Sequence, residues 1–248
     1  MSAESPSTTT PRRWRLRFTL RVLLVVVAAV CVFLAIWTQR ARQQRRVVER
    51  LRQSSRTTIH YDFQFKNGRA RIDDRSGQYE ESKVPAFLRE AFGTDFFHTL
   101  TAVYSSDPKI IKELPDLPSL ELLSLDSDSL VDSDLAPVPE IHGLRSVFIQ
   151  GDIRNPHSTT HVSDDSLAMI PRLRHIKEVF LCGDGFTRQG IISLASARNL
   201  EWVWLEGCTA GVDRSALDAL KNLPRLRYLH VSQGRGRERK TVEEWSPE

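Results

Sequence analysis

Residues 223–231 read LPRLRYLHV, with apolar side chains at the first, fourth, seventh and ninth positions. The same L-x-x-L-x-x-L-x-L spacing, with substitutions, occurs five times. The five copies are Leu117/Leu120/Leu123/Leu125, Ile141/Leu144/Val147/Ile149, Leu173/Ile176/Val179/Leu181, Ala197/Leu200/Val203/Leu205 and Leu223/Leu226/Leu229/Val231. Successive copies start 24, 32, 24 and 26 residues apart, and a unit of that length cannot bury its apolar face alone. We therefore expect the copies to stack, each contributing one short parallel strand.

Other segments complete the predicted repeat unit. A weaker copy of the spacing, Phe97/Leu100/Val103/Ser105, lies twenty residues before the first clear one. Helix-forming segments occupy residues 108–114, 133–138, 164–170, 189–197 and 213–220. We expect Asp164, Asp165 and Asp213 to cap the N-termini of such helices, because their carboxylates can accept the free N–H groups of the first turn. Residues 94–234 are therefore predicted to form a curved parallel sheet with helices on its convex side.

The ends of this repeat region have a different pattern. Residues 57–65 alternate as a strand does, and Asn67-Gly68 is a strong hairpin signal, so we expect a hairpin that returns through residues 69–72. Val84-Pro85 should begin a short helix that stops at Gly93. Residues 57–93 would then cap the open end of the stack. Residues 235–248 are expected to be a flexible C-terminal tail.

The repeats resemble leucine-rich repeats. Together with an Arg-flanked apolar segment at residues 11–42, the sequence VPAFL at 84–88 and DFF at 95–97, they make the chain similar to small single-pass, membrane-anchored bacterial leucine-rich-repeat proteins of unassigned function. The resemblance extends over nearly the whole of residues 12–231. It implies the α/β fold class, as a short solenoid preceded by a single transmembrane helix and a small cap. It also implies an interaction module rather than an enzyme.

Charge is distributed unevenly along the 248 residues. Residues 1–56 contain twelve Arg and two Glu, whereas residues 57–248 contain 23 Lys and Arg against 29 Asp and Glu. The basic excess therefore belongs to the N-terminal segment. A nucleic-acid-binding domain would instead place a basic stripe on its folded part, so no nucleic-acid partner is expected.

An apolar run without charge extends from Val22 to Trp37. With its low-polarity flanks it covers residues 18–38, which is long enough to cross a bilayer as a helix. A cleaved signal peptide is the alternative, but Arg40 and Arg42 occupy the region where small residues would mark a cleavage site. We expect an uncleaved transmembrane helix at 18–38 that follows a basic tail at 1–17 and contacts the lipid bilayer.

Residues 39–56 are predicted to continue this helix, because they are good helix formers without Pro or Gly. Their dense arginines, from Arg40 to Arg56, could contact anionic lipid headgroups or could simply solvate a stalk, and both interpretations remain open. Arginines stand on both sides of the apolar run and nearly balance. The short N-terminal tail favours a signal anchor in the cell membrane, with the C-terminal domain on the non-cytoplasmic side.

Aromatic residues occupy strand positions that point away from the predicted core. The residues concerned are Phe148, Phe180, Trp202, Trp204, Tyr228 and His230. Neighbouring strands are about 4.8 Å apart, so these side chains should form one patch on the concave face. Such patches are typical of protein or peptide binding sites. The alternatives are that residues 233–248 cover the patch, that the assumed register is wrong, or that the patch mediates self-association in a structural scaffold.

Motifs for catalysis are missing from the sequence. It contains no Gly-rich phosphate loop, G-x-S-x-G elbow, H-E-x-x-H pair or C-x-x-C pair. We therefore expect no enzyme activity, no cofactor and no metal site.

Overall fold

The computed structural model describes residues 20–54, 56–65, 81–150, 161–208, 214–233 and 240–245. The predicted basic tail at 1–17 and the predicted hairpin return at 69–72 lie outside these ranges. By internal packing the chain divides into two units, Met1–Gln39 and Arg40–Glu248.

Helix α1, Leu20–Gln53, is the longest element. The elements after it are β1 Thr57–Tyr61, η1 Asp62–Gln64, α2 Ala86–Phe92, α3 Thr94–Phe97, β2 Leu100–Ser105, η4 Pro108–Asp116, β3 Leu122–Asp126, η5 Asp132–Leu135, η6 Val138–Glu140, β4 Ser146–Gln150, α4 Asp164–Met169, η7 Ile170–Arg172, β5 Glu178–Phe186, α5 Arg188–Leu194, β6 Trp202–Cys208, α6 Arg214–Lys221, β7 Tyr228–Gln233 and β8 Lys240–Trp245. Helices and strands alternate through most of the second unit, which confirms the α/β class.

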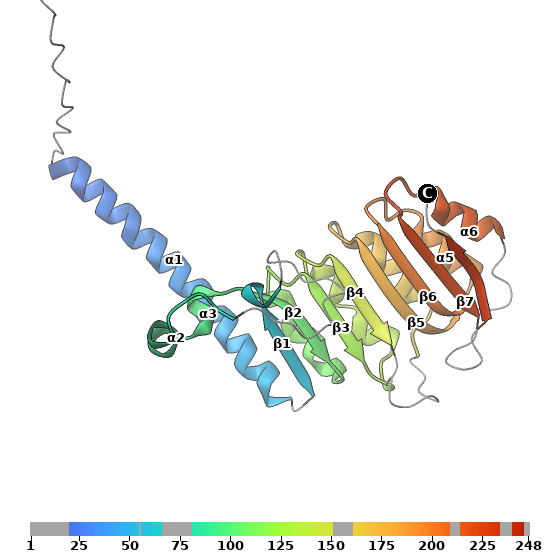
Figure 1. The fold of residues 1–248 in the computed structure, drawn as a ribbon, viewed down its shortest axis with the longest axis horizontal. Helices are drawn as coiled ribbons and strands as arrows, with labels where there is room; N and C mark the ends of the chain where they lie inside the picture. Colours follow the sequence, from blue (N-terminus) through green and yellow to red (C-terminus); the bar gives the residue numbers. More distant parts are fainter. Residues whose placement is uncertain are drawn as a thin grey trace, which may run out of the picture. The chain divides into compact units, whose positions relative to one another are not determined.

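The strands form one sheet in which they follow each other in chain order from β1 to β8 (Figure 1). Pairs from β2 to β7 are parallel, and the sheet has antiparallel pairs at its two ends. The seventh position of every copy falls in one register column: Leu123, Val147, Val179, Val203 and Leu229 are successive partners. Val103 of the weak copy pairs with Leu123 in the same column. The predicted register is therefore confirmed.

The connections between strands close the hydrophobic core on one face of the sheet. Leu114, Val138, Leu167, Leu194 and Leu220, one from each of five connections, are buried in the same cluster as the strand column. The first connections form 3-10 segments rather than the α-helical turns of α4 to α6. Pro115 lies inside η4, and η6 follows Pro137 and contains Pro139; prolines lack the amide hydrogen that an α-helix needs.

Helix capping differs from the expectation. The N-cap of α4 is Ser163, whose hydroxyl accepts a hydrogen bond from the amide of Asp165, and the N-cap of α5 is Thr187. Asp164 does not cap its own helix; its carboxylate accepts hydrogen bonds from the amide of Thr187, at 2.9 Å, and from the Thr187 hydroxyl. Asp132 accepts equivalent bonds from the amide and hydroxyl of Ser163, at 2.9 and 2.7 Å. Each carboxylate therefore joins one connection to the start of the next, and Asp213 lies outside the described residues.

Asp132 makes the stability of the link between these connections sensitive to acid. Burial by itself raises the pKa of Asp132, but the hydrogen bonds from Ser163 and Ser166 outweigh it and hold the pKa below the ordinary 3.8. The ionised carboxylate therefore contributes stability above pH 3.8, and this contribution is lost as pH falls through the lower pKa of the folded state.

We expect Asp132→Asn to lower the free energy of unfolding at pH 7 by about 1 kcal/mol, because the amide cannot accept all of these bonds. Between about pH 5 and about pH 3, where an ordinary carboxylate titrates, the wild type loses the stability that ionised Asp132 contributes. The variant lacks this group, so it should lose less stability over the same range. Denaturant unfolding at both pH values measures the difference. Identical pH dependence in the two proteins would contradict the assignment.

The sheet continues beyond the parallel strands at both of its ends. The described partner of β1 is β2, antiparallel, with Ile59 opposite Val103. At the other end, residues 240–245 were expected in a flexible tail but form β8, which pairs antiparallel with β7. Both additions occupy the edges of the parallel sheet, where unpaired backbone groups would otherwise remain.

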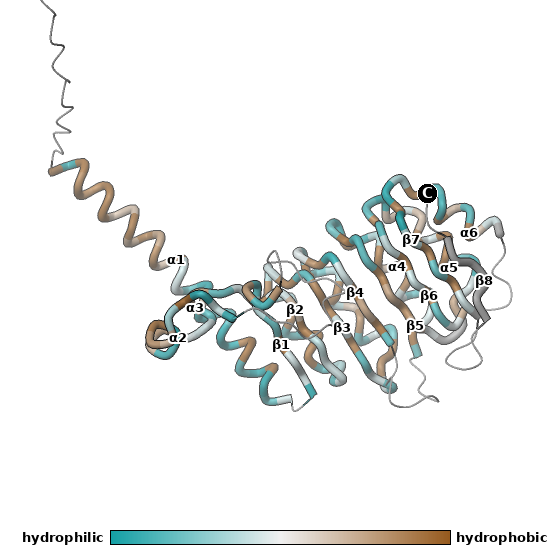
Figure 2. The backbone as a smooth tube through the Cα atoms, viewed as in Figure 1, coloured by the Kyte–Doolittle hydropathy of each residue, from teal (hydrophilic) through white to brown (hydrophobic). Residues whose placement is uncertain are grey.

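Helix α1 changes character along its length (Figure 2). Its first part is exposed and is long and apolar enough to span a membrane, a property that it shares with signal sequences. Its continuation through residues 40–53 confirms the predicted extension of the helix. The idea that this extension is only a solvated stalk is wrong, because Gln44, Val47, Val48 and Leu51 are buried. The three apolar side chains belong to the main core cluster.

Candidate interaction surface

The sheet brings the six aromatic positions of the sequence prediction onto the face opposite the main core. Two register columns hold them, with Phe148, Phe180, Trp204 and His230 in one and Trp202 and Tyr228 in the other. Side chains alternate along a strand, so positions 202 and 204 share a face while Val203 between them enters the core. We call these six residues the aromatic face.

Neighbouring rings of the aromatic face are in contact. The ring centroids are separated by 6.1 Å for Phe148–Phe180, 5.6 Å for Phe180–Trp204, 5.7 Å for Trp202–Trp204, 5.2 Å for Trp202–Tyr228 and 4.3 Å for Trp204–His230. The Trp202 and Tyr228 rings are nearly parallel, at 14°. These spacings are in the range of favourable aromatic pairs, so the rings hold each other in place.

Burial separates the six residues into two groups. Phe148 and His230 were expected at an exposed surface but are only 3% and 5% exposed. Phe180, Trp202, Trp204 and Tyr228 are half-buried, and we call these four residues the aromatic quartet. The quartet spans β5, β6 and β7, so its rings form one continuous apolar surface across three strands.

Phe148 is buried because the chain covers this end of the face. It packs in a second, smaller cluster with Phe65, Ala102 and Leu122. Phe65 follows η1, far upstream of β4 in the chain, and its ring lies 5.8 Å from that of His60. Burial lowers the pKa of His60, which keeps its imidazole neutral near pH 7. The open part of the face is therefore limited to its C-terminal strands.

Two carboxylates accompany the quartet, and the sequence prediction did not include them. Glu178 lies opposite Trp202 and accepts a hydrogen bond from the Ser146 hydroxyl at 2.8 Å. Glu206 accepts one from the Trp204 indole N–H at 2.9 Å, which fixes the orientation of that ring. The period of two along β6 puts positions 202, 204 and 206 on one face, and this signal could have identified Glu206. Aromatic rings beside carboxylates suit a partner that presents Arg or Lys side chains.

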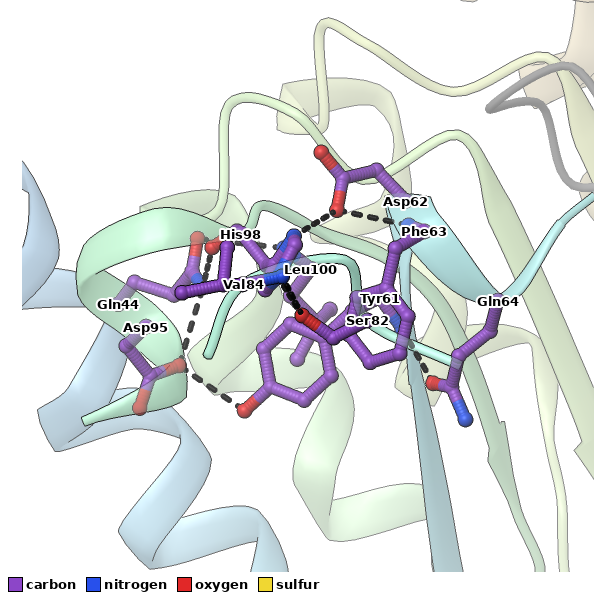
Figure 3. Close-up of polar contacts among 10 residues, drawn as sticks. All are labelled: Gln44, Tyr61, Asp62, Phe63, Gln64, Ser82, Val84, Asp95, His98 and Leu100. Atoms are coloured by element: carbon purple, nitrogen blue, oxygen red, sulfur yellow. Dashed lines mark hydrogen bonds and ion pairs between the residues drawn. The ribbon is translucent and has the colours of Figure 1, made fainter. Parts of the chain in front are cut away.

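A set of hydrogen bonds, separate from the aromatic face, joins α1 to the start of the sheet (Figure 3). The Gln44 amide donates to Asp95 Oδ1 and to the carbonyl of His98, both at 3.0 Å, and its oxygen accepts from the amide of Leu100 at 3.2 Å. The Tyr61 hydroxyl donates to Asp95 at 3.0 Å. Burial, together with the Asp95 carboxylate, raises the pKa of Tyr61 and keeps its phenol protonated. These bonds attach the second half of α1 to α3 and β2.

Ser82, His98 and Asp62 in this region are connected as hydroxyl, imidazole and carboxylate. Ser82 Oγ lies 2.7 Å from His98 Nε2, and His98 Nδ1 lies 3.2 Å from Asp62 Oδ1. A serine nucleophile is activated by groups in this order. Here the Ser82 hydroxyl also accepts from the amide of Val84, and the Phe63 ring lies 4.2 Å from that of His98. The three side chains thus connect the segment before α2 to η1.

Cys182 and Cys208, the cysteines described in the folded unit, form no disulfide. Cys182 lies opposite Glu206, while Cys208 is buried and lies opposite Phe186. Burial raises the pKa of Cys208 to about 12, with smaller contributions from Asp164 and Cys182. The thiol is therefore protonated at physiological pH and is a poor nucleophile.

Comparison of the sequence with known protein families and with curated proteins found no match. Similarity therefore assigns no activity, and the function has to be inferred from the residues of the chain itself.

Proposed function

We propose that this protein is a membrane-anchored interaction module that binds a protein or peptide on the aromatic quartet. The aromatic quartet is the observation that supports the proposal. Its four half-buried rings are in contact across three strands, and a contiguous apolar surface of this kind is typical of interaction sites. Trp and Tyr are favoured at the centres of binding surfaces, where they bury large areas at low entropic cost. Glu178 and Glu206 would select for cationic groups in the partner.

The folded unit acts, in this proposal, as a short leucine-rich-repeat solenoid. Two features support it: strands β2 to β7 are parallel neighbours in chain order, and a helix or 3-10 segment lies between each two of them. Connections of this kind place the strands in a row on one side. The partner would then lie across several strands at once, as it does in a binding site built from repeats.

The apolar part of α1 serves as the anchor in the cell membrane. Its length and composition are those of a membrane-spanning helix, and the arginines that follow, within Arg40–Arg56, would contact anionic lipid headgroups. The folded unit would lie on the non-cytoplasmic side. A reporter that is active on only one side of the membrane, fused after Glu248, tests this orientation, and reporter activity in the cytoplasm would refute it.

Photo-crosslinking in native membranes tests the binding surface. Benzoylphenylalanine replaces Tyr228, which stacks on Trp202, or the exposed His175, which serves as the control position. We expect an adduct with a distinct partner from position 228, none from position 175, and loss of the adduct when Trp202→Ser and Trp204→Ser are introduced together. Intact folding of the double variant is checked by limited proteolysis.

The crosslinking result also separates this proposal from its main alternative. Adducts between two copies of the chain at position 228 would instead indicate a self-associating membrane scaffold. The absence of any adduct at position 228 would refute binding on the quartet. An adduct that persists in the double variant would refute it as well.

A further inference from the structure

The segment formed by α2 and α3 exposes two phenylalanines. Phe87 is 67% exposed and Phe92 is 57% exposed. Among the described residues outside α1, the only other exposed large hydrophobic side chain is Val131, at 36%. The sequence predicted that this segment would cap the core, but these two rings do not enter it. We call residues 86–97, which comprise α2 and α3, the phenylalanine hairpin. Its first helix, α2, is markedly apolar (Figure 2).

The phenylalanine hairpin has a defined shape. Gly93 has φ +84°, a conformation that L-amino acids with side chains rarely adopt, and it turns the chain between α2 and α3. The Phe92 ring lies 5.5 Å from that of Phe96, and the Arg89 guanidinium donates to the carbonyl of Val84 at 3.2 Å. The exposed rings are therefore presented by an ordered segment and not by a frayed end.

The hairpin is attached to the part of α1 that directly follows the apolar run. The amide of Gln44 donates to Asp95 at 3.0 Å, and Gly93 lies beside the Arg45 guanidinium. Gln44 comes six residues after Thr38, where the apolar run ends. Six residues span at most about 22 Å even in an extended chain. An anchor within the bilayer would therefore keep this attachment point close to the lipid headgroups.

Charges around the hairpin are compatible with an anionic surface. Arg42, Arg45 and Arg46 of α1 are exposed, and Lys83 precedes the hairpin. The exposed acidic residues nearby are Glu49, Glu81 and Glu90, so the four exposed basic residues exceed them by one, and half-buried Arg89 and Asp95 cancel each other. Basic side chains at a membrane surface are attracted to anionic lipids.

We propose that the phenylalanine hairpin docks on the membrane surface, with Phe87 and Phe92 inserted at the boundary between headgroups and acyl chains. Exposed aromatic rings beside basic residues are the features of segments that lie in this layer. The inference rests on the proposed function, in which α1 spans the bilayer. It adds a second membrane contact, made by the folded unit itself.

Photo-crosslinking to lipid tests the docking. The full chain is reconstituted into vesicles of phosphatidylcholine and phosphatidylglycerol that contain a radiolabelled lipid. Benzoylphenylalanine replaces Phe87, Phe92, Val30 in the apolar run, or His175, which is exposed elsewhere in the folded unit. We expect lipid adducts from positions 30, 87 and 92, with yields at 87 and 92 about tenfold above that at 175. Replacing phosphatidylglycerol by phosphatidylcholine should lower the yields at 87 and 92 and leave that at 30 unchanged.

The control positions distinguish a failure of the docking from a failure of the transmembrane anchor. Adducts at position 30 without adducts at 87 and 92 would overturn the docking while the anchor stands. Adducts at 87 and 92 to a second copy of the chain or to another protein, instead of lipid, would overturn it as well. No adduct at position 30 would refute the anchor and the docking together.

Discussion

Leu51→Asp is expected to remove much of the stability of the unit formed by residues 40–248. Leu51 is 1% exposed and packs in the main core with Val47 and Val48. A carboxylate in that position would be buried without a partner, which costs about 4 kcal/mol or more. Because a domain has a net stability of only about 5–15 kcal/mol, this loss removes much of it. The tryptophan fluorescence of the full chain, to which Trp202 and Trp204 of the folded unit contribute, measures the effect when it is recorded during thermal unfolding in detergent.

Arg46→Asp is the matched control for this variant. It introduces the same side chain into the same helix, but position 46 is exposed. Its effect on the free energy of unfolding should stay within about 0.5 kcal/mol. Equal melting temperatures for the Leu51→Asp variant and the wild type would show that the second half of α1 is not part of the core.

The contrast between the two halves of α1 shows what the sequence could indicate. Val47, Val48 and Leu51 lie on one side of a helix, and this spacing predicts a buried stripe. It does not identify the surface that buries the stripe, and the dense arginines around it were equally compatible with a solvated stalk and with a lipid contact. The decisive contacts come from Gln44, whose partners Asp95, His98 and Leu100 are more than 50 residues away in the chain. Local patterns carry no information about such partners.

The parallel strands were predictable for the opposite reason. The L-x-x-L-x-x-L-x-L spacing repeats, so aligning the copies also aligns the strands, and the column from Val103 to Leu229 follows directly. Strands β1 and β8 lack this spacing. They add to the sheet in the antiparallel direction, and their partners depend on which edges remain unpaired after the repeats have stacked. A repeat pattern says little about the segments that close its ends.

The aromatic face was predicted in part. Its register follows from the repeat, whereas its exposure depends on what covers it. Phe65, from a segment that precedes the repeats, belongs to the cluster in which Phe148 is buried, and His230 on β7 lies between Trp204 of β6 and strand β8. The period-two pattern identifies a face of a strand but not its neighbours above that face. Of the six predicted residues, the four of the quartet therefore remain candidates for direct contact with a partner.

Phe148→Ala and Trp202→Ala are expected to differ in kind, although both residues lie on the same face. Phe148 is buried in a cluster with Phe65 and Leu122, and deleting its ring leaves a cavity, so the free energy of unfolding should fall by about 3–5 kcal/mol. Trp202 is half-buried and loses mainly its stacking with Tyr228 and Trp204, which amounts to about 1–2 kcal/mol. Denaturant unfolding of the two variants measures both values.

For partner binding we expect the opposite order: among variants that remain folded, a change at Trp202 should reduce binding more than a change at Phe148. Phe148→Leu keeps an apolar side chain in the cluster, so it should remain folded and retain the partner adduct at position 228. Trp202→Ala should remain folded and lose most of that adduct, because it removes a ring of the binding surface itself. If Phe148→Leu abolished the adduct while Trp202→Ala preserved it, the surface that binds the partner would have to lie toward β4 and not on the quartet.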